Sequence, residues 1–214
     1  MKNIIFPILT LFLVCGCSSI PQPERKPVTY GIMDDNIPKS PLDKVQGGHE
    51  KNLAILLSEN TKNFIAYRKK WIEEYEKDLN SLFAPTNHIL ALKEQSNPEF
   101  PSKYIIGKLK NNFGKLSLLP NISSLKKDYD ALAIIDIYEN TQGLFGSSKY
   151  IYEITTAFFT KNKEYITSAK SRISKDIPWN YNNSMDHEIE AHNLLVKSLD
   201  IWNSELQNSI EMSK

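Results

Sequence analysis

One short apolar segment constrains the fold of this chain more than any other feature. Residues 131–138 read Ala-Leu-Ala-Ile-Ile-Asp-Ile-Tyr, with apolar side chains at nearly every consecutive position. Side chains alternate between the two faces of a strand, so a strand formed here is apolar on both faces. This pattern is typical of an interior strand in a sheet that other layers cover on both sides. We therefore predict a central strand at 131–138.

Three further strands are predicted around this segment. Segments 150–160 and 164–173 are rich in β-branched and aromatic residues. Between them stand the residues Lys-Asn-Lys at 161–163, which predict a tight hairpin. A short apolar run at 116–119 is stopped by Pro120 and predicts one more strand. The sheet is therefore expected to hold about four strands.

Helical segments are predicted where apolar residues recur at threes, fours and sevens. The first runs from 49 to 83, and its polar residues 58–61 are a candidate interruption, with Thr61 as a candidate cap for a second helix. Another begins after Pro101-Ser102 and ends at Gly114.

The last helical segment, 185–210, is amphipathic. The order of elements predicts an α+β fold for a single domain at 49–214. In it, a small mixed β-sheet of about four strands is packed by a long N-terminal helical segment, a second helix and a C-terminal amphipathic helix.

The N-terminus has the pattern of a secretory signal. Lys2 is its only charged residue, and an apolar run at 4–14 is too short to span a bilayer. The run ends in Val14-Cys15-Gly16-Cys17. This ending resembles the lipobox of bacterial lipoproteins, with Gly16 before the cleavage point and Cys17 as the lipidated residue.

The resemblance implies that residues 1–16 are a signal peptide and that Cys17 carries a diacylglycerol thioether and an amide-linked chain such as palmitate. Cys15 is the rival lipidation site, but the Val14 before it is bulkier than the Gly or Ala that the family prefers. Ser18 after the cysteine favours the outer membrane, with the domain facing the periplasm. Residues 17–48, with five prolines, are expected to form a tether.

Composition excludes several kinds of site. Both cysteines lie in the signal region, so the mature domain has no thiol for a nucleophile, a zinc site or an iron–sulfur cluster. His187 and His192 are five residues apart, which places them about 140° apart around a helix, so they cannot share one metal ion. With 26 basic and 25 acidic residues the chain lacks the basic excess of nucleic-acid binders. No metal and no cofactor is expected.

One candidate acid stands inside the central strand. Asp136 interrupts the apolar run, and a buried carboxylate is costly unless it is paired or hydrogen-bonded. Lys170 or Arg172 on a later strand could neutralise it. An Asp136–Glu153 pair would make the protein a cell-wall or glycan hydrolase if the two carboxyl groups faced each other across an open cleft. Residues 128–130, Asp-Tyr-Asp, are interpreted as a solvated acidic turn rather than a metal site.

The other candidate site is the loop at 142–147, where two glycines flank Leu144 and Phe145. Loops are normally exposed, so these two side chains are candidates for binding a partner or a membrane surface. The function expected from the sequence is that of a lipid-anchored, non-catalytic envelope lipoprotein. Its domain would bind a protein or cell-wall component, with no catalytic residue of its own. A small-molecule carrier is the third alternative and would need a large apolar cavity between helices and sheet.

Overall fold

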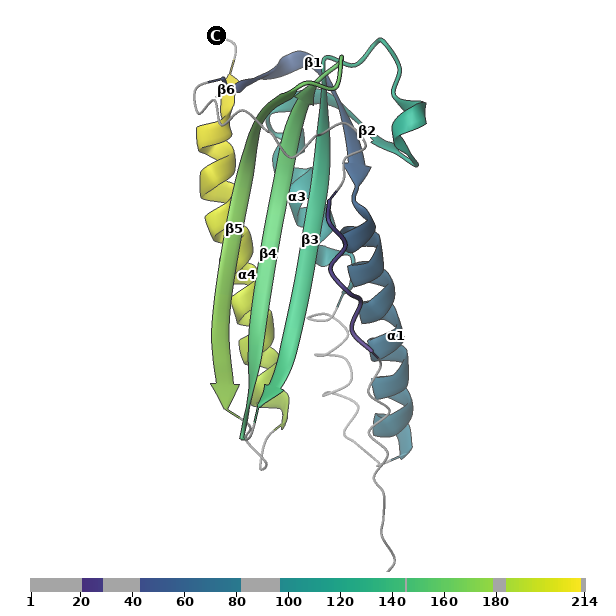
Figure 1. The fold of residues 1–214 in the computed structure, drawn as a ribbon, viewed down its shortest axis with the longest axis vertical. Helices are drawn as coiled ribbons and strands as arrows, with labels where there is room; N and C mark the ends of the chain where they lie inside the picture. Colours follow the sequence, from purple (N-terminus) through teal and green to yellow (C-terminus); the bar gives the residue numbers. More distant parts are fainter. Residues whose placement is uncertain (1–20, 29–42, 82–96, 145, 179–183, 213–214) are drawn as a thin grey trace, which may run out of the picture.

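The computed structural model describes residues 21–28, 43–81, 97–144, 146–178 and 184–212. In these residues a mixed six-stranded sheet packs with three α-helices, so the α+β class is confirmed (Figure 1). The strands are β1 (Val45–Leu57), β2 (Phe113–Leu119), β3 (Ala131–Leu144), β4 (Ser147–Thr160), β5 (Tyr165–Pro178) and β6 (Ile210–Met212). The helices are α1 (Glu59–Ser81), α3 (Phe100–Lys110) and α4 (Ser184–Ser209), with a short 3-10 turn η1 (Ile122–Ser124).

The strand order is β2-β1-β3-β4-β5, and β6 pairs with the start of β1 outside this path. β1 is parallel to β2, β3 and β6, whereas β3, β4 and β5 form an antiparallel meander. The predicted strand at 131–138 therefore lies in the middle of the sheet, as expected. The predicted hairpin at 161–163 is also confirmed, because it joins β4 to β5.

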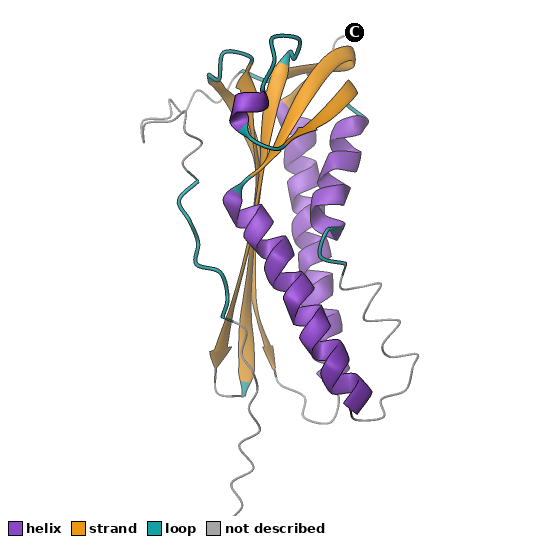
Figure 2. Ribbon diagram, turned by 90° about the vertical axis from the view of Figure 1, so that its right-hand side faces the viewer, coloured by secondary structure: helices purple, strands orange, loops and turns teal. Residues whose placement is uncertain are grey.

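Helices α3 and α4 cover one face of the sheet, as Figure 2 shows. On this face Ile135 and Ile137 of β3 pack with Leu199 and Trp202 of α4 in the main hydrophobic core. Leu132 and Ile134 point to the opposite face and join a smaller cluster. The two clusters explain why the strand had to be apolar on both sides.

The expected helical segment at 49–83 is wrong in its first part. Residues 49–57 belong to β1, and only α1, from Glu59 onward, is helical. Leu53, Ala54 and Ile55 are all buried, because β1 lies between β2 and β3 with both faces covered. Six strands replace the expected four because β1 and the three-residue β6 were not predicted.

The other helices are close to their predicted positions. α3 has a proline in its first turn, and α4 spans nearly the expected segment. Gly114 does not end a helix but lies in β2, beside the backbone of His49, where a side chain would not fit. No helix among the described residues has the length and hydropathy needed to cross a membrane.

Candidate functional site

The site begins where β1 ends and α1 starts, beside the central strand. After Leu57 the backbone N–H of Ser58 still donates to Ile135 O at 2.9 Å, so the ladder continues for one residue. Thr61 then replaces the missing strand, because its Oγ1 accepts from Ile137 N–H and donates to Ile135 O, both at 2.8 Å. α1 thereby takes the edge of β3 that β1 leaves open (Figure 1).

Thr61 was the expected cap of this helix, but the capping residue lies one turn earlier. Ser58, not Thr61, supplies the capping side chain: its Oγ accepts from the backbone N–H of Thr61 at 3.1 Å. This is the ordinary N-terminal cap of a helix. The same hydroxyl donates to Asp136 Oδ1 at 2.5 Å, so the start of α1 also holds the buried carboxylate.

Asp136 is buried, with 4% of its surface exposed. Its Oδ1 accepts from Ser58 Oγ and from Asn60 Nδ2, the latter at 3.1 Å. Burial raises the pKa of the Asp136 carboxyl above its ordinary value, while these two bonds and the positive charge of Arg25 oppose the rise. The prediction that Lys170 or Arg172 neutralises Asp136 is wrong, because Arg172 binds Glu153 instead.

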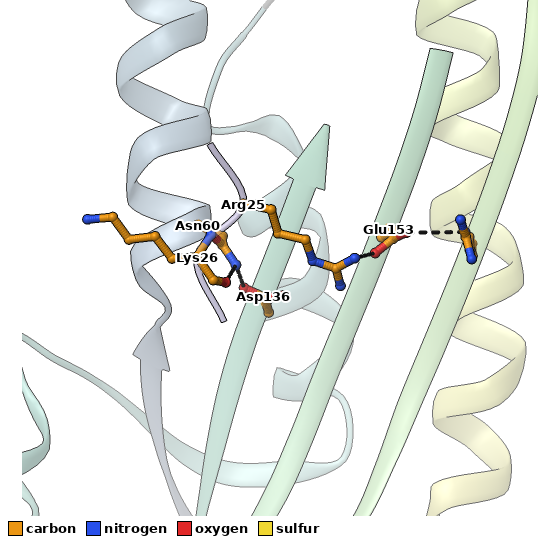
Figure 3. A network of polar contacts seen from close by, with 6 residues as sticks. Arg25, Lys26, Asn60, Asp136 and Glu153 are labelled. Carbon is orange, nitrogen blue, oxygen red and sulfur yellow. Dashed lines mark hydrogen bonds and ion pairs between the residues drawn. The ribbon is translucent and has the colours of Figure 1, made fainter. Parts of the chain in front are cut away.

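An N-terminal segment, residues 21–28, lies along β3 on the face opposite α3 and α4; we call it the strap (Figures 1 and 2). Gln22 Oε1 accepts from Thr141 N–H at 2.9 Å. The Lys26 N–H donates to Asn60 Oδ1 at 2.9 Å, and Asn60 Nδ2 donates to Lys26 O at 3.0 Å. Asn60 therefore binds the strap and Asp136 at once, as Figure 3 shows.

Arg25 is the strap residue that reaches furthest over the sheet. Its guanidinium forms an ion pair with Glu153 (Figure 3). It also lies 5.2 Å from the centre of the Tyr138 ring. Glu153 also pairs with Arg172 Nε at 3.1 Å and is only 15% exposed. Tyr138 and Glu153 are opposite each other in the β3–β4 register. The Arg25 guanidinium can therefore contact the Tyr138 ring and the Glu153 carboxylate at once.

Asp136 and Glu153 lie on the same face of the sheet, on neighbouring strands. Asp136 is opposite Thr155, two residues from Glu153. Both carboxylates are engaged by the protein's own groups: two neutral donors for Asp136, and Arg25 with Arg172 for Glu153. The arrangement binds the strap to the sheet rather than leaving a pair of free carboxyl groups around an open cleft.

The predicted loop at 142–147 lies only partly within the described residues. Leu144 is the last residue of β3 and pairs with Ser147, and Gly146 has a φ of 78°, which favours glycine. The side chain of Leu144 and all of Phe145 lie outside the described residues. Cys17 and the signal peptide also lie outside them.

The remaining candidates have local roles. Asp130 Oδ2 accepts from Asn52 N–H at 2.7 Å, so this carboxylate holds the start of the β1–β3 pairing. The His192 ring lies 5.8 Å from the Phe100 ring, in contact with α3. Across the described ranges, no three His, Cys, Asp or Glu side chains are grouped to hold a metal ion.

A hollow of about 440 Å³ lies between the strap and the end of β1. Val28, Leu56 and Ile122 are among its lining residues. The start of α1 also lines it, through Glu59, Asn60 and Lys62. The small-molecule-carrier alternative would instead need a large apolar cavity between the helices and the sheet.

Sequence reasoning found Asp136 but missed the strap and Asn60. Residues 21–28 were assigned to the tether because prolines separate them. Asn60 lies in the polar stretch 58–61, which the sequence indicates as an interruption between two helical parts rather than as a change from strand to helix. The polar stretch 58–61 was the available signal, because it marked the point where strand changes to helix.

Comparisons with known proteins identify no family. No family model and no curated protein matches the sequence. Two solved structures of a PelC dodecamer from Paraburkholderia phytofirmans, one of them a single-substitution variant, have 6% sequence identity and TM-scores of 0.37 and 0.36. They cover 74% and 75% of this chain, and 93% and 94% of their own. A likeness this distant does not identify a function.

Proposed function

We propose that the protein is a lipoprotein of a bacterial outer membrane, lipidated at Cys17, whose domain binds another envelope component without catalysis. The observation that carries the non-catalytic part is the engagement of both candidate carboxylates. Asp136 accepts bonds from Ser58 and Asn60, and Glu153 forms ion pairs with two arginines. A general acid or nucleophile has to reach its substrate, whereas these groups hold the protein's own segments.

The anchor is supported by the lipobox-like residues that end the apolar N-terminus. Several acyl chains on one cysteine give stable anchoring, because each buried CH₂ adds about 0.8 kcal/mol. The strap begins only four residues after Cys17. A lipid on Cys17 would therefore hold the domain close to the membrane surface.

For the binding part, the turn between β3 and β4 remains the proposed contact. Leu144 and Phe145 are flanked by Gly143 and Gly146 at the end of a long hairpin. Burial of two such side chains against a partner or a membrane would contribute about 1.5–3 kcal/mol each.

The anchor is tested by labelling growing cells with a fatty-acid analogue. Cys17→Ser should abolish the label and leave a longer precursor or a soluble form. Cys15→Ser is the matched control and should keep the label. Equal labelling of the Cys17→Ser variant and the wild type would contradict lipidation at Cys17.

Two measurements test the domain. Purified protein should release no soluble fragments from isolated cell-wall sacculi, and release that disappears in Glu153→Gln would establish the hydrolase instead. Leu144→Asp combined with Phe145→Ser should weaken recovery of cross-linked envelope components while the melting temperature stays nearly unchanged. A large fall in melting temperature would place both side chains in the core.

A further inference from the structure

The strap has a fixed direction on the sheet. Gln22 binds the backbone at Thr141, Arg25 lies over Tyr138, and Lys26 binds Asn60 beside Asp136. As the strap continues, its partners come earlier in β3, so the two segments run antiparallel. The first strap residues therefore lie nearest the β3–β4 turn, as the purple segment in Figure 1 shows.

The length of chain between anchor and strap limits where the membrane can be. Cys17 precedes Gln22 by five residues, which span at most about 18 Å when fully extended. From Thr141 the strand continues for two residues to Gly143, about 7 Å, toward the turn. In the other direction ten residues, about 33 Å, separate Thr141 from Ala131. The anchor can reach the turn but not the opposite end.

We infer that the turn end of the sheet, formed by Gln142, Gly143, Gly146 and Ser147, faces the lipid surface that holds the anchor. This inference rests on the proposed lipidation of Cys17. The opposite end, where Lys161 and Asn162 join β4 to β5, points away from that surface.

The strands carry different charges at their two ends. At the turn end the first charged strand residues are Lys149 and Asp176, which are opposite each other and of opposite sign. α4 also begins near this end, with Asp186 and Glu188 in its first turns, so the orientation rests on the length of the chain and not on charge. At the other end Lys161, Lys163 and Glu164 are all exposed, as suits water.

Single cysteine labels can test the orientation, because Cys17 is the only cysteine of the proposed mature protein. The lipidated protein would carry an environment-sensitive fluorophore at Gly143→Cys, Lys161→Cys or Lys170→Cys, in phosphatidylcholine vesicles with a nitroxide quencher near the headgroup. A Cβ atom added at Gly143 would meet no neighbouring atom within 4 Å, so there is room for a cysteine at this position. Lys170 is exposed on the strap face, opposite Thr155.

The label at 143 should be quenched several-fold more than the labels at 161 and 170. Quenching that is equal at 143 and 161, or stronger at 161, would overturn the inference. Equal quenching at 143 and 170 would mean that the domain lies flat on its strap face, which also overturns it. Failure of the wild-type protein to sediment with vesicles would instead contradict the anchor itself.

Inserting a spacer distinguishes orientation by the short chain after Cys17 from non-specific adhesion of the turn end to lipid. Inserting about 20 Gly/Ser residues after Ser19 lengthens the chain to a root-mean-square span of about 25 Å. The variant should still sediment with vesicles but lose the preferential quenching at 143. If the preference persisted, the short connection would not be what orients the domain.

Discussion

The side-chain amide of Asn60 binds both backbone groups of Lys26, accepting from its N–H at 2.9 Å and donating to its carbonyl at 3.0 Å. This is the pairing that a neighbouring strand would offer, supplied here by one side chain at the start of α1. The same Nδ2 group donates to Asp136. One amide therefore connects the strap, the first helix and the central strand.

We expect Asn60→Ala to release the strap. The variant loses three hydrogen bonds at a buried position, which should lower the free energy of unfolding by about 2–3 kcal/mol in a urea titration. Trypsin should cleave after Arg25 faster than in the wild type. Lys62→Ala, an exposed position in the same helical turn, is the control and should change neither quantity. Unchanged cleavage in Asn60→Ala would show that the strap is held by other contacts.

The stability of the protein should depend on pH through Asp136. Burial raises the pKa of this carboxyl above 3.8 in the folded state, so folding favours the protonated form. The stabilisation that the protonated Asp136 gives to the folded state is fully present below the ordinary pKa of an aspartate. It is lost as the pH rises through the raised pKa of Asp136 in the folded protein. Asp136→Asn stays neutral, and its Oδ1 can still accept from Ser58 and Asn60.

The free energy of unfolding of Asp136→Asn, relative to wild type, should therefore increase as the pH is raised from about 4 to about 8. Urea titrations across this range measure the difference. A difference that is independent of pH would show that Asp136 titrates alike in the folded and unfolded chains.

Arg68 and Glu139 form a buried ion pair between α1 and β3. The atoms Nε and Oε2 are 3.1 Å apart, and the side chains are 14% and 6% exposed. Arg68→Met leaves the carboxylate buried beside β4, so we expect a loss of about 3–5 kcal/mol in unfolding free energy. Adding Glu139→Leu should recover much of that loss.

The exposed pair on the same helix is the control. Lys70 and Glu74 are 3.9 Å apart and 60% and 31% exposed, so Lys70→Met should change stability by less than about 1 kcal/mol. Equal effects of Lys70→Met and Arg68→Met would contradict the importance of burial.

Thr61→Val tests the replacement of a strand by a side chain. Valine keeps the shape but removes Oγ1, so the buried Ile137 N–H loses its acceptor, at a cost of about 1–3 kcal/mol. Hydrogen exchange of the Ile137 amide should become faster, whereas Thr61→Ser should keep it slow. Protection that survives in Thr61→Val would mean that another group satisfies this N–H.

Some elements could be predicted because their pattern has one interpretation. The run at 131–138 is apolar on both faces and too short for a helix, so it predicted β3 correctly. β1 was missed because Leu53 and Leu57 are four residues apart, the spacing of a helical face, and this segment continues into a true helix. β6 has only three residues and gives no periodic signal.

The site was predictable only in part for a similar reason. The cost of burying Asp136 indicated that the fold had to supply this carboxylate with hydrogen-bond partners, and the start of α1 does so. The partners themselves, Ser58 and Asn60, come from about 76–78 positions earlier in the chain. They could be identified only once the strand-to-helix change at residue 58 was known. Arg172 was a reasonable expectation from the strand pattern, but register places it opposite Glu153.

The pairing of β1 has a consequence for the time course of folding. Every strand that pairs with β1 comes later in the chain, and one of them, β6, comes at the end of the domain. A chain that emerges N-terminus first therefore exposes an unpaired apolar strand until residue 113 or later has appeared. Such contacts form slowly, because distant segments must meet before any bond is gained. During that interval the unpaired edges of β1 are open to association with other chains.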